Sequence, residues 1–219
     1  MRAIFESGFY YLYLVSIISI GIFLLIKKKN IYFAIALIIL GLGDAFHLMP
    51  RAIGLYTKTL DNPGETLNMW LGVGKLITSI TMTIFYVFLY MYVYARMKIS
   101  RSKSNDIMVM LLFVIRIALL CLPQNRWLTN DGALWIGIVR NIPFLLLGIF
   151  DIYLLIKYLR KEKYYKTLYI ATILSFAFYI PVVVFASKYS WVGMMMLPKT
   201  ICYLWIGVLA LLDGVKSHD

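Results

Sequence analysis

The chain has 219 residues, of which 62% are hydrophobic and only 15% carry a formal charge. A soluble domain of this length has too little interior to bury so much apolar surface, so the composition indicates an integral membrane protein with one transmembrane domain over residues 1–219. The net charge of +12 lies in short clusters between apolar runs rather than on a long hydrophilic segment. Nucleic acid is therefore excluded as a partner, and the membrane lipid bilayer is the expected one.

Seven apolar segments are long enough to cross about 30 Å of hydrocarbon, which predicts an all-α bundle of seven transmembrane helices. Their predicted limits in chain order are 9–26, 31–49, 67–94, 107–123, 133–156, 167–187 and 191–212. The first segment is followed by three lysines without a small-residue cleavage pattern, so we expect it to stay as a span. The fourth segment is the shortest, and Arg116 interrupts it.

The orientation follows from the basic residues of alternate loops. One side carries thirteen, namely Lys27, Lys28, Lys29, Arg96, Lys98, Arg101, Lys103, Lys157, Arg160, Lys161, Lys163, Lys166 and Lys216. The other side carries five, namely Arg2, Arg51, Lys58, Arg126 and Lys188. Because cytoplasmic loops hold the excess of Lys and Arg, we expect the N-terminus outside and the C-terminus in the cytoplasm. The frequent Ile, Lys, Tyr and Phe suit an AT-rich bacterial genome, which favours a bacterial plasma membrane.

Ionisable residues fall within five of the predicted spans at nearly one depth. They are Asp44, Lys75, Arg116, Arg140 and Lys199. Counting 1.5 Å per residue from the span limits puts four of them in the outer half of the bilayer and Arg116 nearer the midplane. A charge at the bilayer centre costs about 3 kcal/mol on insertion scales, so such a cluster predicts a functional site. Four cations oppose one carboxylate, and an arginine hardly loses its proton, so we expect a bound anion or a water-filled cavity.

Polar residues and prolines surround this charged level. Asp44, His47 and Arg51 share one helix face by their spacing of i, i+3 and i+7. His47 is the sole histidine within a span, so the sequence predicts no metal site, and nothing in it indicates a cofactor. Three prolines, at positions 143, 181 and 198, free backbone carbonyls nearby and help to open a cavity. The predicted ligand-binding side chains are Arg140, Lys199, Arg116, Lys75, Asp44, His47, Asn141, Tyr86, Tyr179 and Tyr203.

Asp151 and Asp213 lie near the predicted cytoplasmic ends of their spans, close in sequence to Lys157 and Lys216. We expect them to form ion pairs at the membrane boundary or to be solvated. Lys199 in the last span invites comparison with retinal-binding proteins, but the third span has no carboxylate and no retinal-pocket motif surrounds the lysine. The comparison therefore stops there.

Three functions remain open from the sequence. The first is a transporter or receptor whose outward-facing basic cavity binds an anionic small molecule or a lipid headgroup, with Arg140 and Arg116 as bidentate clamps. The second is an intramembrane enzyme acting on a lipid-like substrate, with Asp44 and His47 as its acid–base pair. The third is a structural subunit whose buried charges pair only with one another. The sequence leaves the oligomeric state open.

Overall fold

The computed structural model describes residues 2–60, 62–186 and 189–216, and within them the chain is helical with no strand. The seven α-helices are α1 (Arg2–Ile26), α2 (Ile31–Tyr56), α3 (Glu65–Met97), α4 (Lys103–Leu120), α5 (Leu134–Leu154), α6 (Leu168–Phe185) and α7 (Met196–Lys216). A π-helical turn, η2 (Leu155–Leu159), continues α5, and two 3-10 segments, η1 (Pro123–Asn125) and η3 (Ser190–Met195), precede α5 and α7. The prediction of an all-helical chain is confirmed.

Six of these helices are long and apolar enough to cross a membrane, as an integral multi-pass membrane protein requires. The exception is α4, whose 18 residues include Lys103, Asp106 and Arg116. At 1.5 Å per residue it is also only about 27 Å long. A seventh span and the orientation of the chain therefore stay predictions.

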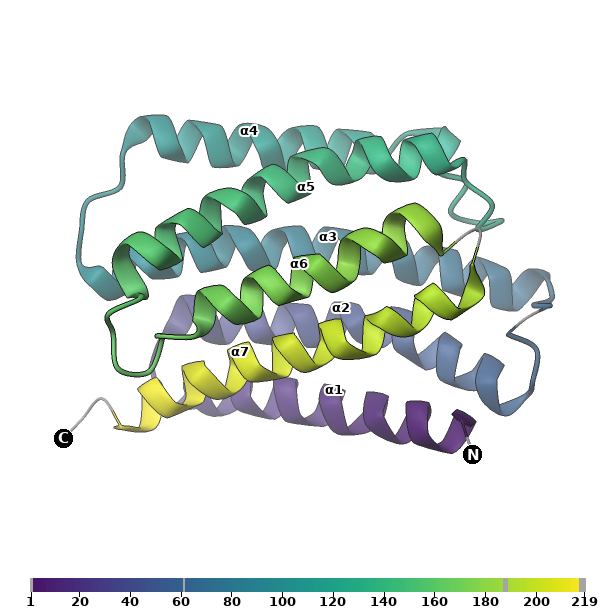
Figure 1. The fold of residues 1–219 in the computed structure, drawn as a ribbon, viewed down its shortest axis with the longest axis horizontal. Helices are drawn as coiled ribbons and strands as arrows, with labels where there is room; N and C mark the ends of the chain where they lie inside the picture. Colours follow the sequence, from purple (N-terminus) through teal and green to yellow (C-terminus); the bar gives the residue numbers. More distant parts are fainter. Residues whose placement is uncertain (1, 61, 187–188, 217–219) are drawn as a thin grey trace.

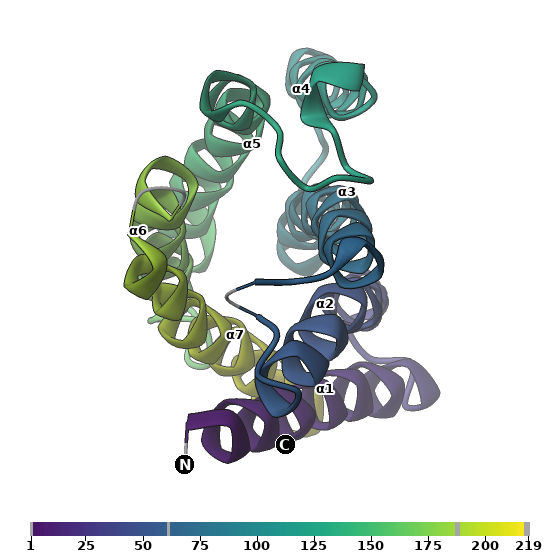
Figure 2. The same ribbon diagram turned by 90° about the vertical axis from the view of Figure 1, so that its right-hand side faces the viewer.

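The helices follow one another around the bundle, and each packs against its neighbours in sequence, while α7 closes the ring against α1 (Figures 1 and 2). Because the helices alternate in direction, the connections gather at two ends. The N-terminal end holds the start of α1 and the segments 57–60, 62–64, 121–133 and 189–195. The C-terminal end holds segments 27–30, 98–102 and 160–167 and the end of α7.

Most predicted helix limits lie within a few residues of the observed ones, but two helices are much longer at the N-terminal end. α1 begins at Arg2 rather than at residue 9, and α2 runs through Pro50 to Tyr56 rather than ending at 49. The additional residues of α1 include the buried Glu6 and Ser7, so this stretch belongs to the bundle and not to a polar tail. The longer α2 keeps Asp44, His47 and Arg51 on a single helix, as expected from their spacing.

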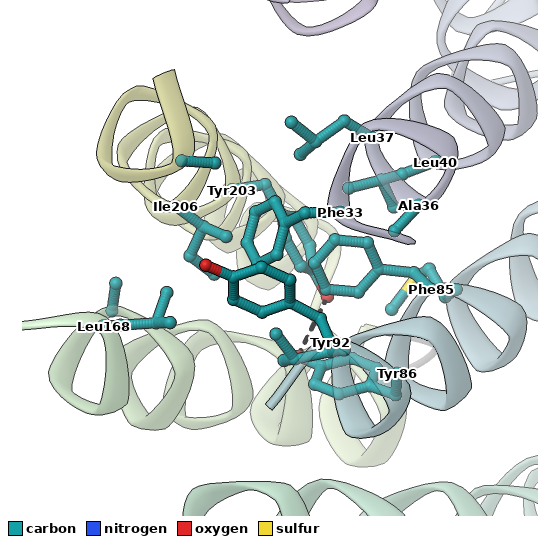
Figure 3. Close-up of a cluster of buried hydrophobic side chains, with 14 of the residues drawn as sticks. Phe33, Ala36, Leu37, Leu40, Phe85, Tyr86, Tyr92, Leu168, Tyr203 and Ile206 are labelled. Atoms are coloured by element: carbon teal, nitrogen blue, oxygen red, sulfur yellow. Dashed lines mark hydrogen bonds between the residues drawn. The ribbon is translucent and has the colours of Figure 1, made fainter. Parts of the chain in front are cut away.

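An aromatic core fills the middle of the bundle between α2, α3 and α7 (Figure 3). Phe85 is fully buried and meets Tyr86 edge to face with ring centroids 5.2 Å apart, and Tyr203 with centroids 5.6 Å apart. Phe33 packs against Tyr92 in the same manner at 4.8 Å. Edge-to-face pairs add about 0.5–1.5 kcal/mol each beyond their buried area, so this core is a rigid block between the two ends.

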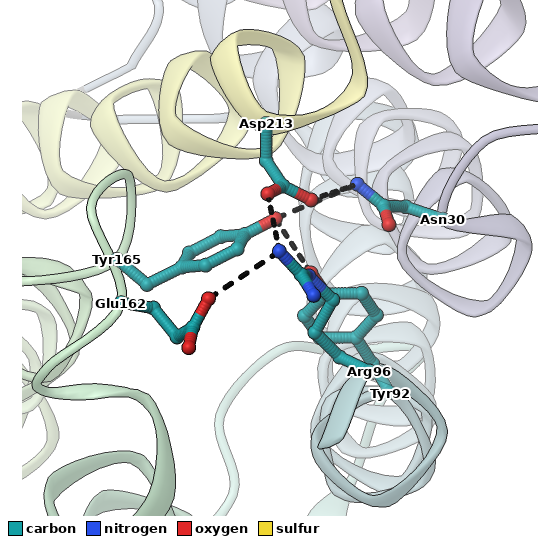
Figure 4. A network of polar contacts seen from close by, with 6 residues as sticks. All are labelled: Asn30, Tyr92, Arg96, Glu162, Tyr165 and Asp213. Carbon is teal, nitrogen blue, oxygen red and sulfur yellow. Dashed lines mark hydrogen bonds and ion pairs between the residues drawn. The ribbon is translucent and has the colours of Figure 1, made fainter. Parts of the chain in front are cut away.

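A polar network joins four elements at the C-terminal end (Figure 4). Its residues are Asn30, Tyr92, Arg96, Glu162, Tyr165 and Asp213. Arg96 of α3 donates to Asp213 of α7 at 3.0 Å and lies 3.4 Å from Glu162. Asn30 donates to the other oxygen of Asp213 at 3.0 Å. Asp213 is 2% exposed, so this is a buried ion pair.

The expectation of a boundary ion pair or a solvated carboxylate is met by the ion pair of Asp213 and is wrong for Asp151. Asp213 pairs with Arg96 across the bundle, because α7 brings it beside α3. Asp151 is fully buried and has no partner among the described residues, and Lys157 lies instead over the rings of Tyr153 and Tyr158.

Candidate functional site

A cavity of about 610 Å³ opens at the N-terminal end of the bundle. Its wall is built by α2, α3, α5, α6, α7 and the segment that links α4 to α5. A volume of this size is within the usual range for small-molecule sites. Its charged lining is basic, and no acidic side chain lines it among the described residues.

Six of the ten predicted ligand-binding residues line the cavity. They are His47, Lys75, Arg140, Asn141, Tyr179 and Lys199. The other four, Asp44, Arg116, Tyr86 and Tyr203, are buried behind the wall. Their predicted contact with a ligand would thus need the wall to move, and they support the lining residues from behind.

Lys199 is almost fully buried, at 3% exposure. Its contacts in the described part of the chain are with a sulfur atom and with aromatic rings. Its ammonium donates to the Met82 sulfur at 3.3 Å and lies over the rings of Tyr179, at 4.5 Å from the centroid, and Tyr203, at 5.4 Å. Aromatic faces attract a cation, but they do not cancel its charge. The Tyr179 hydroxyl is held by Asn141, to whose side-chain oxygen it donates at 2.8 Å.

Lys75 and Arg140 are fixed by the segment between α4 and α5. The Lys75 ammonium donates to the Asn130 side-chain oxygen at 2.6 Å, and Arg140 donates to the Asn125 side-chain oxygen at 2.6 Å. The Arg140 guanidinium also lies over the Trp127 ring, 4.3 Å from its centroid. Both cations are held in place by neutral groups, so no carboxylate among the described residues offsets their charge at the cavity wall.

Arg116 braces Arg140 from behind the wall. The Arg116 guanidinium is 1% exposed, donates to the backbone carbonyl of Arg140 and lies 5.4 Å from the centroid of the Phe144 ring. Its Nε atom and that of Arg140 have no hydrogen-bond partner among the described residues. Two buried guanidinium donors are thus unused, which is costly unless a ligand or water accepts from them.

The close approach of α2 and α3 brings His47 beside these cations. A side chain at Gly74 of α3 would overlap the Phe46 carbonyl and the His47 backbone, so glycine is needed at this crossing. His47 lies within electrostatic range of Lys75, Arg51 and Lys199, and its Nδ1 atom has no partner in the described part of the chain. Several positive charges therefore converge on one side of the cavity.

The two buried acids at this end, Asp44 and Glu6, form their contacts outside the cavity lining. Asp44 accepts from the Tyr13 hydroxyl at 2.7 Å. It senses the charge of Lys199, yet no ion pair within 4 Å joins it to any described residue. A second buried acid, Glu6 of α1, pairs with Arg51 at 3.4 Å and accepts from Tyr10 at 3.0 Å. The expectation of a single interior acid is therefore wrong, because α1 begins seven residues earlier than predicted.

None of the four cations predicted within the spans, Lys75, Arg116, Arg140 and Lys199, forms an ion pair with a described residue; Arg116 and Lys199 are buried, Arg140 is half-buried and Lys75 is exposed. The structural-subunit hypothesis requires them to be paired with carboxylates, so the observed contacts do not favour it. Sequence reasoning missed Asn125, Trp127 and Asn130, which hold the cavity cations. They lie in the short connection between α4 and α5, which has no hydrophobic periodicity, so their polarity was the available sequence signal.

Comparison with protein-family models, with curated proteins and with solved structures finds no match for this chain. The interpretation of the site therefore rests on its geometry and charge.

Proposed function

We propose that the chain is a membrane transporter or receptor whose basic cavity opens outward and binds an anionic small molecule or a lipid headgroup. The observation that carries the proposal is the cluster of Lys75, Arg140 and Lys199 on the wall of one cavity, without a carboxylate partner. Lys75 also senses the positive charges of Arg140 and Arg51, so the cations repel one another when the cavity is empty. A bound anion relieves this repulsion.

The geometry suits a carboxylate, sulfate or phosphate group. A guanidinium presents several donors in one plane, and the Nε atom of Arg140 is unused. Lys199 and Lys75 supply point charges from α7 and α3. The apolar part of a ligand would lie against Trp191, Met194 and Met196, which also line the cavity. With the predicted orientation, the N-terminal end and its cavity face the outside of a bacterial cell.

The alternative function, an intramembrane enzyme that uses Asp44 and His47 as acid and base, needs proton exchange between these two side chains. Asp44 hydrogen-bonds Tyr13 rather than His47 and does not line the cavity. These contacts support binding rather than catalysis.

The proposal is tested by anion-induced thermal stabilisation of the purified protein in detergent. The panel consists of chloride, sulfate, phosphate, citrate and glutamate, together with phosphatidylglycerol and phosphatidylcholine in mixed micelles. An anion at 100 times its dissociation constant stabilises the folded state by about 2.7 kcal/mol. We expect at least one anion to raise the melting temperature, and we expect Arg140→Ala to abolish this rise.

The matched control is Arg126→Ala. Arg126 is an exposed arginine at the same end, is paired with Asp131 at 3.0 Å and does not line the cavity. The Arg126→Ala variant should keep the full anion-induced rise in melting temperature. Equal responses of wild-type protein, Arg140→Ala and Arg126→Ala across the panel would overturn the proposed function. A response to phosphatidylglycerol alone would identify the lipid headgroup as the ligand rather than a free anion.

A further inference from the structure

Asp151 of α5 is a buried acid that the anion cavity does not use. Its side chain is fully buried, and neither carboxylate oxygen has a hydrogen-bond partner among the described residues. It lies 17 residues after the start of α5, or about 26 Å along the helix from the N-terminal end of the bundle. Ionisable residues at such positions in membrane proteins are expensive and usually mark proton or ion pathways.

Within the described part of the chain, no charged side chain compensates Asp151. On α5, Gly148 lies directly against Phe176 of α6, so the next turn of each helix brings Asp151 near Thr172, whose hydroxyl donates to a backbone carbonyl. On α3, the Tyr86 phenol lies within electrostatic range of the Asp151 carboxyl group. The charged groups of α4 are engaged elsewhere, Asp106 with Tyr90 and Arg116 with the Arg140 carbonyl. An unpaired carboxylate in this apolar environment is strongly disfavoured, so the carboxyl group carries a proton.

A row of hydroxyl groups leads from the cavity wall toward Asp151. Lys199 lies over the Tyr203 ring, and the Tyr203 hydroxyl is 3.5 Å from that of Tyr86. The Tyr86 hydroxyl is 3.3 Å from Ser175 of α6, the helix that packs against Asp151's own. All three hydroxyl residues are buried. These hydroxyl groups extend from behind the cavity wall into the aromatic core, where Tyr86 lies within electrostatic range of Asp151.

We propose that Asp151 is a proton-binding site, and that the chain moves a proton together with the anion bound in its cavity. This inference rests on the proposed function, and it selects a transporter over a receptor. In the structure described here, Asp151 is sealed from both ends and holds its proton. When the bundle opens toward the C-terminal end, water reaches the carboxyl group, the O–H bond breaks, its electron pair stays on the oxygen and the proton leaves to water.

The first experiment needs no anion. The protein is reconstituted in vesicles of phosphatidylethanolamine and phosphatidylglycerol, and the carbonyl stretch of protonated carboxylic acids is recorded by infrared spectroscopy at neutral pH. We expect Asp151→Asn to remove one such band. Asp106→Asn is the matched control, because Asp106 accepts from Tyr90 and pairs with Arg101, so its replacement should leave the band in place. A spectrum unchanged by Asp151→Asn would overturn the proton site.

The second experiment follows internal pH with a trapped dye while sulfate is added outside the same vesicles. Sulfate is fully ionised at neutral pH, so any proton that enters with it is carried by the protein. We expect acidification with wild-type protein, its loss in Asp151→Asn and a slower rate in Tyr86→Phe. Sulfate-induced thermal stabilisation should stay unchanged in Asp151→Asn, which shows that the variant is folded and still binds.

The possible failures are distinguishable. Stabilisation by sulfate without acidification in wild-type protein would overturn the coupling and leave the anion site intact. Equal acidification in wild-type protein and Asp151→Asn would do the same. No stabilisation of wild-type protein by sulfate would count against the cavity as a sulfate site, and the infrared spectrum would then still decide whether Asp151 holds a proton.

Discussion

The two ends of the bundle handle buried positive charge in opposite ways. At the C-terminal end, Arg96 is paired with Asp213 and Glu162, and Asn30 occupies the second oxygen of Asp213. At the N-terminal end, Lys199 and Arg140 have only neutral partners.

This difference separates structural charges from functional ones. A buried cation with a carboxylate partner holds helices together and needs nothing more. A buried cation without a carboxylate partner destabilises the folded state, and a bound anion can remove this destabilisation. The network of Figure 4 therefore seals one end, whereas the other end is prepared for an anion. Removal of a cation should then have opposite effects on stability at the two ends.

The largest effect is expected from Arg96→Met at the sealed end. The substitution keeps an unbranched apolar stem but removes the guanidinium, which leaves the buried Asp213 without its ion-pair partner. Loss of one partner of a buried pair costs about 3–5 kcal/mol, and we expect about 3 kcal/mol because the Arg96 side chain is 30% exposed. The free energy of unfolding is measured by titration with a denaturing detergent, followed by circular dichroism.

Lys161→Ala is the control for this variant, since Lys161 is an exposed cation of the same end and should change stability by less than about 0.5 kcal/mol. If Arg96→Met behaves like Lys161→Ala, the network does not seal the bundle and the contrast between the ends fails.

Glu6→Gln tests the exception at the open end, where one acid does pair with a cation. The amide keeps the shape of the side chain and loses the charge that faces Arg51. A hydrogen bond to a charged group contributes about 1.5–3 kcal/mol, and we expect a loss of about 1.5 kcal/mol in the same unfolding assay. The anion-induced rise in melting temperature should persist, because Glu6 does not line the cavity. Loss of that rise would extend the binding site to α1.

Lys199→Met removes a cation from the open end, and it should raise stability rather than lower it. Methionine has a similar length and suits an environment of Met82 and two tyrosine rings. We expect a gain of about 1 kcal/mol in the absence of anions, since apolar replacement of buried charge is often neutral or stabilising. Anion-induced stabilisation should fall at the same time. A loss of stability as large as that of Arg96→Met would make Lys199 a structural charge.

The contrast between the ends could be read from the sequence only in part. Long apolar runs predict most of the helices, because the thickness of the hydrocarbon sets the length of a helix that crosses it. The early start of α1 escaped because Arg2 and Glu6 resemble a polar tail. Glu6, Tyr10 and Tyr13 do, however, share one face at i, i+4 and i+7, and that spacing was the available signal.

Charge partners are harder to predict than helices. Asp213 lies 117 residues from Arg96, and nothing local in either segment specifies that they meet. Asp151 looked like a boundary residue, because the π-helical turn that carries α5 on to Leu159 leaves no periodic mark in the sequence. The burial of Asp151 follows from that extension and from the packing of α6, and both depend on tertiary structure.

The smallest effect is expected from Tyr165→Phe, which probes how tightly the sealed end excludes water. Tyr165 is 1% exposed, and its hydroxyl accepts from Tyr92 at 2.6 Å. Loss of this bond should cost about 1 kcal/mol at neutral pH. Burial, with the neighbouring Tyr92 and Asp213, raises the pKa of Tyr165 well above 10, so the folded state keeps the phenol protonated after the unfolded chain has lost that proton. Stability should therefore fall with rising pH once the pH exceeds the unfolded value of about 10, and Tyr165 contributes at most about 1.4 kcal/mol per pH unit to this fall.

Tyr165→Phe should remove that share of the slope, whereas the neighbouring Tyr164→Phe should leave more of it, since Tyr164 is outside the network of Figure 4. The assay is the same unfolding titration, repeated from neutral to alkaline pH. An identical alkaline slope in both variants would mean that water already reaches Tyr165 in the folded state. In that case the C-terminal end is open rather than sealed, and the cation pairs at that end hold the helices together without closing a path through the bundle.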